Sequence, residues 1–495
     1  MKKRYIAALD QGTTSSRTIL FDDKGKIAAM AQIEFPQIYP NPGWVEHDPR
    51  NILSSQLRSF RRALKEGGIL PQEVAAVAVA NQRETTLVWD RYTGKPVYNA
   101  IVWQCRRTSA YCEKMKAEHG RFIYERTGLQ PDAYFSASKI RWILDNVPFA
   151  RERAEKGGLL FGTVDTFLIW HLTRGKVHAT DRTNASRTML YNIHTMQWDE
   201  ELCKLFGVPL SMLPEVKPSG ADYGTSAAEI LGAEIPVCAA VGDQQGALFG
   251  QFCTEPGDAK NTYGTGCFLL ANTGKRAVAS GNGLITTLTA SLDRPDYALE
   301  GSVFIGGAAV QWLRDGLGLV KTAAETEEIA LSVPDTGGVC FVPAFVGLGA
   351  PHWDPECRGM LCGVTRGTTR AHIVRAVLES IALQVFDVVH AMEQDLRRAV
   401  NRLSADGGAS ANNFLMQFQA DVLGVPVVRP AVMETTAFGA ACLAGLYCGF
   451  YGSLAGLRDA VGAFRVFRPA CEEARRVEKL KSWEDALARA MYRVR

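Results

Sequence analysis

The stretch YIAALDQGTTSSRTILF, from Tyr5 to Phe21, decides how the chain begins to fold. Two apolar runs, Tyr5–Leu9 and Ser16–Phe21, flank the polar turn Asp10-Gln11-Gly12 and a row of hydroxyl residues. A third apolar run, Ile27–Phe35, follows another short polar turn. Apolar runs of strand length with short turns between them predict an antiparallel three-stranded meander.

The sequence after the meander predicts helices alternating with buried strands. Asp48-Pro49 is a typical start of a helix, and apolar residues recur at helical spacing through Leu64. Val74–Ala80 and Val237–Val241 are continuous apolar runs, as expected of strands buried on both faces. This is the pattern of an α/β domain.

The second half of the chain repeats the pattern of the first. Ala259–Tyr263 and Cys267–Ala271 are strands around the turn Gly264-Thr265-Gly266. A long helix is predicted over Ile373–Met392, and the strand Arg402–Ala405 leads into a Gly-Gly turn. We therefore expect an internal structural duplication around a central cleft, with one domain over residues 1–250 and the other over residues 251–495.

Composition excludes several classes of protein. A net charge of +3 over 495 residues gives no electrostatic reason to bind nucleic acid or a membrane surface. The apolar run after Lys2-Lys3-Arg4 is interrupted by Asp10, so we expect neither a signal peptide nor a membrane span. The twelve cysteines are scattered without zinc spacing, and we interpret them as reduced thiols of a cytoplasmic protein. Glu472–Arg495 mixes both signs of charge and is predicted to be a solvated helix.

Two Gly/Thr turns are the strongest candidates for phosphate binding, since neither GxxxxGK[ST] nor GxGxxG after a strand occurs. They are Gly12-Thr13-Thr14-Ser15 and Gly264-Thr265-Gly266. Glycine permits the positive φ that turns N–H groups toward one point, and hydroxyls add donors. Arg17 would add a charged contact. One such turn alone is more simply a hairpin; two in corresponding places favour a phosphate site.

Carboxylates and an Arg-Glu pair stand at the ends of the predicted strands. Asp10 and Asp243 follow apolar strands, where one carboxylate could orient Mg²⁺ and the other could accept a proton. The alternative is that either caps a helix. Arg83-Glu84 places a donor fork beside an acceptor, which suits a ligand with neighbouring hydroxyls; the alternative is a surface ion pair. Trp103 and Tyr134 could pack on a carbon skeleton, although each alone is more typical of a core.

Longer motifs resemble those of the FGGY carbohydrate kinases. They are Asn81–Thr86, Trp103–Thr108 and Val241–Gln245, with two extended signatures at Tyr134–Asn146 and Gly359–Glu379. Within the family the motifs are most similar to those of members that phosphorylate glycerol. The resemblance runs from Asp10 to about Gly445. It implies the actin-like ATPase fold, in which two ribonuclease-H-like domains face a central cleft, the first binding polyol and phosphate and the second binding the nucleotide.

The resemblance also implies roles for individual residues. ATP and Mg²⁺ are the expected cofactors, glycerol is the expected substrate, and Asp243 is the expected catalytic base. The expected glycerol contacts are Arg83, Glu84, Trp103, Tyr134, Asp243, Gln244 and Phe268. The expected nucleotide contacts are Thr13, Thr14, Ser15, Arg17, Thr265, Gly307, Gln311, Gly408 and Asn412. The expected metal contacts are Asp10 and Asp243.

Two alternatives and one departure accompany the resemblance. A kinase of another small polyol or ketose has the same motifs, and an actin- or chaperone-like module could use the same fold to change shape. Glu234 stands where some bacterial members carry an Arg that binds fructose 1,6-bisphosphate, and the loop Ser219–Gly232 lacks the histidine that others phosphorylate. Neither regulation is therefore expected. The sequence fixes no oligomeric state, and a dimer or tetramer is compatible with it.

Overall fold

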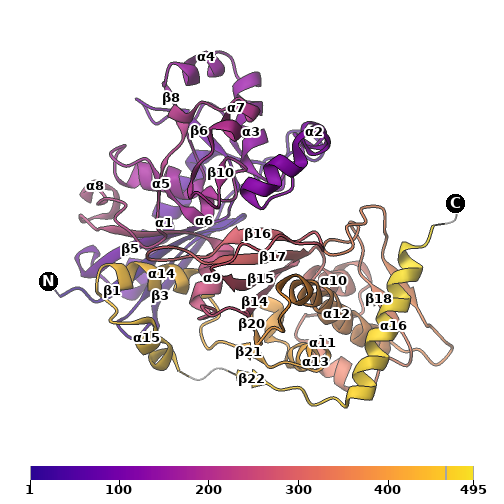
Figure 1. Cartoon of the computed structure of the whole chain (residues 1–495). Helices are drawn as coiled ribbons and strands as arrows, with labels where there is room; N and C mark the ends of the chain where they lie inside the picture. Colours follow the sequence, from indigo (N-terminus) through magenta and orange to yellow (C-terminus); the bar gives the residue numbers. More distant parts are fainter. Residues whose placement is uncertain (1, 463–464, 494–495) are drawn as a thin grey trace. The chain divides into compact units, whose positions relative to one another are not determined.

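The computed structural model describes residues 2–462 and 465–493. Residue 1 of the first predicted domain, and residues 463–464 and 494–495 of the second, lie outside the described residues, as does the end of the predicted C-terminal helix. The chain forms two compact units (Figure 1). The first comprises Met1–Phe252, Thr286–Tyr297 and Thr435–Gly462. The second comprises Cys253–Ile285, Ala298–Glu434 and Ala463–Arg495. The first unit is therefore discontinuous, which no feature of the sequence predicted.

The sheet of the first unit has the order β13-β5-β1-β2-β3. Its strands are β1 (Tyr5–Gln11), β2 (Ser15–Phe21), β3 (Ile27–Glu34), β5 (Val74–Asn81) and β13 (Val237–Gly242). The meander β1-β2-β3 is antiparallel, and β1, β5 and β13 are parallel. The predicted antiparallel meander and the predicted buried strands β5 and β13 are confirmed. Because β1, β5 and β13 run in one direction, their carboxyl ends meet at one edge of the sheet.

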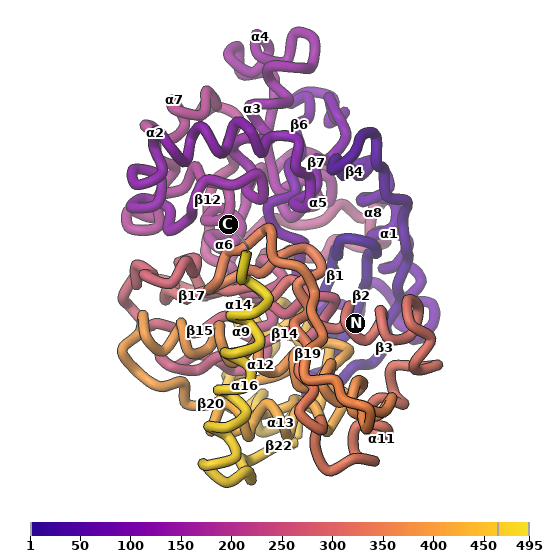
Figure 2. Tube along the Cα trace, turned by 90° about the vertical axis from the view of Figure 1, so that its right-hand side faces the viewer, coloured from indigo at the N-terminus to yellow at the C-terminus, as the bar shows by residue number. Residues whose placement is uncertain are grey.

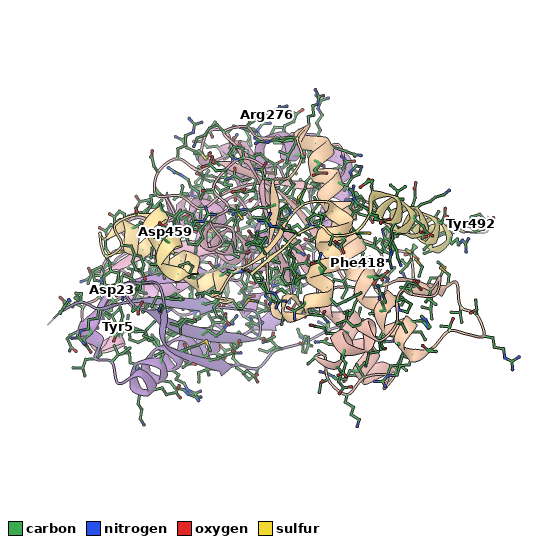
Figure 3. The ribbon with its side chains drawn as sticks, turned by 90° about the horizontal axis from the view of Figure 1, so that it is seen from below. Tyr5, Asp23, Arg276, Phe418, Asp459 and Tyr492 are labelled. Carbon is green, nitrogen blue, oxygen red and sulfur yellow. The ribbon has the colours of Figure 1, made fainter. Side chains whose placement is uncertain are left out.

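Helices cover this sheet because each has an apolar face. In α1 (Pro49–Gly67) the Asp48 carboxylate accepts from the Arg50 amide and caps the helix, and Ile52, Phe60 and Leu64 are buried. The returning helix α14 (Thr435–Tyr447) packs against β1, β5, β13 and α9 (Asp243–Gly250). A side-chain atom at Val461, the end of α15 (Leu454–Val461), lies near Gly25, and Figure 3 shows Asp459 and Asp23 on the same side of this unit.

The remaining elements of the first unit are short strands and helices, and α2, α3, α4 and α7 gather at one end of the unit (Figure 2). The strands are β4 (Glu46–His47), β6 (Leu87–Asp90), β7 (Ala100–Ile101), β8 (Leu159–Gly162), β9 (Ala179–Asp181), β10 (Tyr191–Asn192), β11 (Gln197–Trp198) and β12 (Glu215–Lys217). The helices are α2 (Ser109–Thr127), α3 (Ser136–Asn146), α4 (Ala150–Glu155), α5 (Val164–Leu172), α6 (Arg182–Ala185), α7 (Glu200–Phe206) and α8 (Ala228–Leu231).

The second sheet repeats the topology of the first. Its order is β16-β17-β15-β14-β20-β21-β22. The strands are β14 (Asp258–Tyr263), β15 (Cys267–Gly274), β16 (Ile285–Leu288), β17 (Tyr297–Val303), β20 (Arg402–Asp406), β21 (Val427–Arg429) and β22 (Arg465–Phe467). Strands β15-β14-β20-β21 pair antiparallel, parallel and parallel, as β2-β1-β5-β13 do. The predicted duplication is confirmed, and each unit has the strand order of a ribonuclease-H-like domain.

The helices of the second unit pack around α12 (Arg370–Leu396), which contains the predicted run Ile373–Met392. The others are α10 (Gly307–Gln311), α11 (Glu325–Leu331), α13 (Asn413–Leu423) and α16 (Glu473–Met491), with a small sheet of β18 (Cys340–Val342) and β19 (Met360–Cys362). The predicted C-terminal helix is present, and most of its residues are exposed or half-buried. One face of α16 buries Trp483, Ala486 and Leu487 in the core of the unit.

Among the described residues, no helix has both the length and the apolar composition needed to span a membrane.

Candidate active site

The first unit places an ion pair at the end of β1. Asp10 and Arg17 are directly opposite in the β1–β2 ladder, and Arg17 Nη2 lies 3.3 Å from Asp10 Oδ2. Asp10 is 5 % exposed, whereas Arg17 is only half-buried. The cross-strand pairing therefore holds one carboxylate and one guanidinium together at the edge where the parallel strands end.

The turn Gly12–Ser15 is a tight hairpin whose hydroxyls differ in exposure. The Gly12 amide donates to the Ser15 carbonyl at 2.9 Å. Thr14 is exposed, Thr13 is half-buried and Ser15 is buried. The indole of Trp103 donates to Thr13 Oγ1 at 3.1 Å, so the structure brings a predicted substrate contact to a predicted phosphate contact.

The explanation by positive φ is wrong for these turns. Among the described residues, Gly12, Gly264, Gly266 and Gly408 are all absent from the positive-φ glycines, whereas Gly407 has φ 83°. Close packing explains two of these glycines, Gly12 and Gly266. A Cβ on Gly12 would lie 3.2 Å from the Ser15 carbonyl oxygen, and one on Gly266 would lie 2.4 Å from the Val303 carbonyl oxygen. At Gly12 and Gly266 another part of the backbone approaches closely, whereas a Cβ on Gly264 would meet nothing nearer than 3.6 Å and one on Gly408 nothing within 4 Å.

Arg83 and Asp243 meet at the ends of β5 and β13. Arg83 Nε lies 3.1 Å from Asp243 Oδ1, and Arg83 Nη1 donates to Gln245 Oε1 at 3.3 Å. Gly242 makes room for the pair, since a Cβ there would lie 2.8 Å from the Arg83 side chain. The side chain of Arg83 is almost fully buried, but that of Asp243 is 34 % exposed. The carboxylate is thus fixed on one side and accessible on the other.

Asp243 is the first residue of α9, and Gly242 is its N-cap. The alternative prediction that Asp243 is a capping residue is therefore not confirmed, although Asp243 Oδ1 accepts from the Gln244 amide at 2.7 Å. A carboxylate in the first turn is stabilised by the positive end of the helix dipole. Thr436 on α14 donates to the Asp243 carbonyl at 3.1 Å and fixes its backbone.

Glu84 is buried beside two arginines, so the alternative of a surface ion pair is wrong. Its carboxylate accepts from Arg187 Nε at 2.6 Å and lies 3.8 Å from Arg83 Nε. Glu84 is 1 % exposed and Arg187 is 0 % exposed. The backbone of Glu84 has φ 61°, an unusual conformation for a residue with a side chain. The surrounding bonds hold it, including one from Ser136 Oγ to the Glu84 carbonyl at 3.0 Å.

Tyr134 and Trp103 form an aromatic pair beside this carboxylate. Their rings are 5.5 Å apart in an edge-to-face arrangement, and the Arg187 guanidinium lies 5.4 Å from the Tyr134 ring. Both aromatic side chains are half-buried, so each keeps a face for a ligand. The structure thereby collects Arg83, Glu84, Trp103, Tyr134 and Asp243 at one place in the first unit, with Gln244 next to Asp243.

Lys139 fixes the segment that carries Tyr134. Its ammonium is fully buried and donates to the carbonyls of Ala133, Tyr134 (2.7 Å) and Phe135 (3.0 Å). Burial lowers the pKa of Lys139 to about 8, while the charge of Glu84 opposes this shift. Lys139 matched a family motif by spacing alone, and Arg187 matched none of the motifs; only the fold reveals what either side chain contacts.

A buried polar network supports the strand ends. The Asp181 carboxylate accepts from Asn184 Nδ2 at 2.9 Å, and Asn184 exchanges bonds with Asn81 at the end of β5. Thr183 Oγ1 accepts from the Gly242 amide at 2.8 Å. Burial raises the pKa of Asp181, and burial together with the nearby Asp181 raises the pKa of Asp165 to about 6. These hydrogen bonds fix the carboxyl ends of β5 and β13, just before Arg83 and Asp243 in the sequence.

In the second unit, Thr265 and Gly307 lie together. The amides of Gly306 and Ala308 donate to the Thr265 carbonyl at 2.8 and 3.1 Å, and the Gly307 amide donates to the Gly264 carbonyl at 2.8 Å. The start of α10 is thus fastened to the β14–β15 turn. The Thr265 residue remains exposed.

The other predicted residues of the second unit lie on neighbouring elements. Gly408 begins the short 3₁₀ turn after β20 and is exposed. Asn412 caps α13 through its side chain and donates to Thr326 Oγ1 at 3.1 Å. Gln311 is exposed at the end of α10, and Phe268 is half-buried on β15. None of these six predicted residues carries a charge, in contrast with the first unit.

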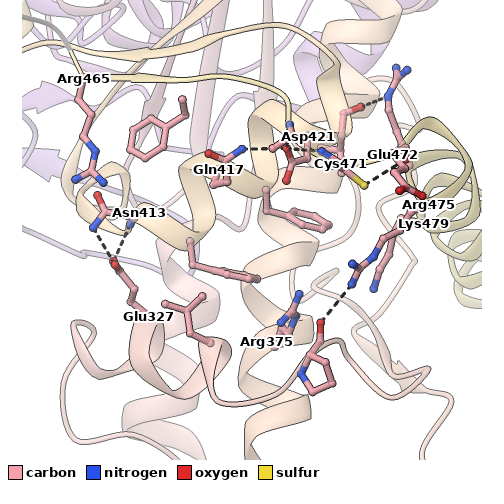
Figure 4. Close-up of a pocket in the computed structure, with 18 residues that line it drawn as sticks. Glu327, Arg375, Asn413, Gln417, Asp421, Arg465, Cys471, Glu472, Arg475 and Lys479 are labelled. Atoms are coloured by element: carbon pink, nitrogen blue, oxygen red, sulfur yellow. Dashed lines mark hydrogen bonds between the residues drawn. The ribbon is translucent and has the colours of Figure 1, made fainter.

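A cavity of about 740 Å³ lies elsewhere in the second unit, between α11, α13 and α16 (Figure 4). None of the predicted site residues lines it. Much of its charge is already bonded: Lys479 and Arg375 pair with Glu379, and the Asp421 carboxylate accepts from the Ala470 and Cys471 amides. The cavity therefore adds nothing to the candidate active site.

The donor set fits magnesium held mainly by phosphate and water. Among the described residues, no group of three or more acidic, histidine or cysteine side chains could enclose a metal ion. Asp10 and Asp243 each have an arginine neighbour, yet a carboxylate has about four acceptor sites. Mg²⁺ usually binds through one or two carboxylates together with substrate phosphates, and two such carboxylates are present.

Sequence comparison decides the family. The model of the FGGY family of carbohydrate kinases, N-terminal domain, matches residues 5–250, and the C-terminal domain model matches residues 259–448. This chain belongs to the FGGY family of carbohydrate kinases. The predicted family resemblance is confirmed.

Relatives within the FGGY family cover the whole chain. Glycerol kinase 2 of Thermotoga maritima is 58 % identical over 99 % of both chains, and the glycerol kinase of Symbiobacterium thermophilum is 59 % identical over 99 % of both. The crystal structure of Plasmodium falciparum glycerol kinase with ADP matches with a TM-score of 0.94 and 36 % identity over 100 % of both chains. A gluconate kinase from Lactobacillus acidophilus shares the fold, with a TM-score of 0.87 at 22 % identity over 98 % of both chains.

Proposed function

We propose that this FGGY kinase transfers the γ-phosphoryl group of ATP to glycerol and forms sn-glycerol 3-phosphate, as part of glycerol uptake and catabolism. The observation that carries the proposal is the buried cluster of Arg83, Glu84 and Arg187 beside the accessible Asp243 carboxylate. Full-length relatives named glycerol kinase, at 57–59 % identity, support the choice of substrate.

The cluster suits a short polyol because it offers donors and acceptors at fixed positions. Arg83 supplies N–H donors and Glu84 supplies carboxylate acceptors, so neighbouring hydroxyls on one ligand can bond to both. Trp103 and Tyr134 provide apolar faces for the carbon atoms between the hydroxyls. A ligand lacking those hydroxyls would leave buried charges unsatisfied, which makes the site selective.

Asp243 is the proposed catalytic base. It accepts the proton of a terminal glycerol hydroxyl as that oxygen attacks the γ-phosphorus in line with the leaving group. Its accessible carboxylate is oriented by Arg83 and by the Gln244 amide. The protein contributes mainly positioning and charge stabilisation, because phosphoryl transfer requires little covalent work from the enzyme.

The phosphate contacts are proposed on both units. Thr13, Thr14, Ser15 and Arg17 serve the phosphates from the first unit, and Thr265, Gly307, Gln311, Gly408 and Asn412 serve the nucleotide from the second. Asp10 and Asp243 would hold hydrated magnesium, which supplies positive charge to the phosphoryl oxygens when it is bound. Phe268 is proposed to line the carbon face of glycerol.

A kinase of another small polyol or a ketose is the second candidate, because FGGY kinases of that kind share the fold. Relatives named xylulose kinase are only about 21 % identical, so they support the fold alone. An actin- or chaperone-like module needs no charged polyol cluster, and the match of both carbohydrate-kinase domains argues against it.

The test is a coupled assay of ADP release with glycerol, xylulose, ribulose or no acceptor. We expect ADP release that depends on glycerol and is far weaker with either ketose. A preference for a ketose would replace the proposed substrate. ADP release at the same rate with every acceptor and with none would support the shape-changing module and contradict the kinase proposal.

A further inference from the structure

Two cysteines that are distant in sequence lie in contact within the first unit. Cys238 lies on β13 and Cys448 directly follows α14, and the two thiols are close enough for each to shift the pKa of the other. Cys238 is 4 % exposed, whereas Cys448 is exposed. The proposed function uses neither residue.

The packing of α14 along β13 brings the chain segments that carry these two thiols together. Near one end of the helix, Thr436 Oγ1 donates to the Asp243 carbonyl at 3.1 Å. From Asp243 back to Cys238 the strand spans about 17 Å, and from Thr436 to Cys448 the helix spans about 18 Å, at the usual rise of each element. The two lengths match, so an antiparallel helix beginning beside Asp243 ends beside Cys238.

Glycine contacts hold the helix in this position. A Cβ on Gly439 of α14 would lie 1.9 Å from the Gly246 carbonyl oxygen of α9, so the two helices touch through their backbones. A Cβ on Gly220 would lie 3.1 Å from the Leu443 carbonyl oxygen, and Gly220 pairs with Ala239, the neighbour of Cys238. The end of α14 therefore lies against the start of β13 by contacts that do not involve sulfur.

We propose that Cys238 and Cys448 form a reversible disulfide, with Cys448 as the attacking thiol and Cys238 as the resolving thiol. The bond would covalently join the end of α14 to the strand that leads into Asp243. The site is a redox modification site, and its oxidant is a small disulfide such as oxidised glutathione.

The reaction proceeds by two thiol–disulfide exchanges. The Cys448 thiolate attacks one sulfur of the small disulfide, forming a mixed disulfide and releasing one small thiolate, which takes up a proton. The Cys238 thiol then loses its proton and attacks the Cys448 sulfur, releasing the second small thiol. Two protein thiols are oxidised, and one small disulfide is reduced to two thiols.

The local environment favours this direction of attack. The interaction with Cys238 lowers the pKa of the exposed Cys448 thiol, and the same interaction together with burial raises the pKa of Cys238. A thiolate that is exposed reacts with an external disulfide, whereas a buried thiol reacts only with a sulfur brought to it.

The chain contains a matched pair for comparison. Cys340 and Cys362 are direct partners in the β18–β19 ladder, and both are half-buried. Burial raises the pKa of Cys340 to about 11, so little thiolate is present near neutral pH. The two residues are ladder neighbours, but the Cys340 thiol is a poor nucleophile, and we expect the pair to remain reduced under the same conditions.

The experiment treats the full-length protein with oxidised glutathione, alkylates the remaining thiols and maps the peptides without reduction. We expect a peptide joining Cys238 to Cys448, a mass loss of about two daltons from the two thiol hydrogens, and reversal by dithiothreitol. Cys448→Ser should abolish the linked peptide, whereas Cys362→Ser should leave it. The thermal midpoint of the oxidised protein should rise because the bond restricts the unfolded chain.

Two results would overturn the inference. One is glutathione retained on Cys448 while Cys238 is still alkylated, which would show that Cys238 does not resolve the mixed disulfide. The other is no reaction at Cys448. Because Cys238 is buried, a substitution there could disturb folding, so both Cys238→Ala and Cys238→Ser are tested. Whichever variant has the thermal midpoint of the unmodified protein should accumulate the mixed disulfide on Cys448.

Discussion

The two units have the same strand order but organise their candidate site residues differently. In the first unit, charged side chains are buried and paired, as in Arg83 with Asp243 and Arg187 with Glu84. In the second unit, the candidate residues are uncharged, and backbone contacts such as Gly307 to Gly264 hold them. Buried, paired charges favour a ligand whose polar groups match them, whereas uncharged hydroxyl and amide groups make no such demand. The same strand order thus carries two different kinds of candidate site.

The largest effect should come from Asp243→Asn, in the first unit. The amide keeps the shape but cannot accept the hydroxyl proton, so kcat should fall about 10²- to 10⁴-fold. Stopped assays of ADP formation measure the loss, and Asp23→Asn in an exposed turn is the control. ATP binding should be unchanged; turnover close to that of the unmodified enzyme would disprove the base assignment.

The next effect should come from Arg187, which holds Glu84 without being a proposed ligand. Arg187→Met leaves a buried carboxylate short of a partner and should lower the unfolding free energy by about 3–5 kcal/mol. The milder Arg187→Lys retains charge but loses the planar fork, and we expect the glycerol KM to rise about 100-fold with little change in the ATP KM. Equal changes in both KM values would indicate a purely structural role. Arg126→Lys, at a partly exposed ion pair, is the control.

In the second unit, whose candidate site residues are uncharged, Gly266→Ala should disturb nucleotide binding. The added methyl would lie 2.4 Å from the Val303 carbonyl oxygen, so the turn must shift, and the ATP KM should rise about 10-fold. Gly264→Ala is the matched control, because its nearest neighbour would be 3.6 Å away. If the two variants behave alike, close backbone packing does not explain the turn.

The smallest effect concerns the network behind the charged unit. Burial raises the pKa of Asp165 to about 6, while the unfolded chain releases this proton near pH 4. Folding therefore binds a proton between these values, and the unfolding free energy should fall by about 3 kcal/mol as pH rises through this window. Urea unfolding from pH 4 to 8 should show this slope, and Asp165→Asn should flatten it. An identical slope in the variant would mean that Asp165 does not titrate there.

Periodicity and turn chemistry predicted the repeated strands and the helix α12, because these signals are local. The contacts within the site were not local. Arg187 and Glu84 are 103 positions apart in the sequence, although they form an ion pair in the structure. Nothing near Arg187 in the sequence indicates this buried pair. The pattern Gly-Thr-Gly correctly indicated a tight turn, but neither glycine has positive φ, and neighbouring backbone crowds only Gly266. The family resemblance identified the candidate residues; their roles stay predictions.

The return of Thr435–Gly462 to the first unit affects how the protein can be made. During synthesis the residues up to Phe252 emerge before α14, which packs against β1, β5 and β13. The nascent first unit must therefore expose part of its sheet until the ribosome has passed Gly462. Such a surface is available to chaperones or to self-association during translation. A fragment ending at Phe252 should aggregate unless α14 is supplied with it.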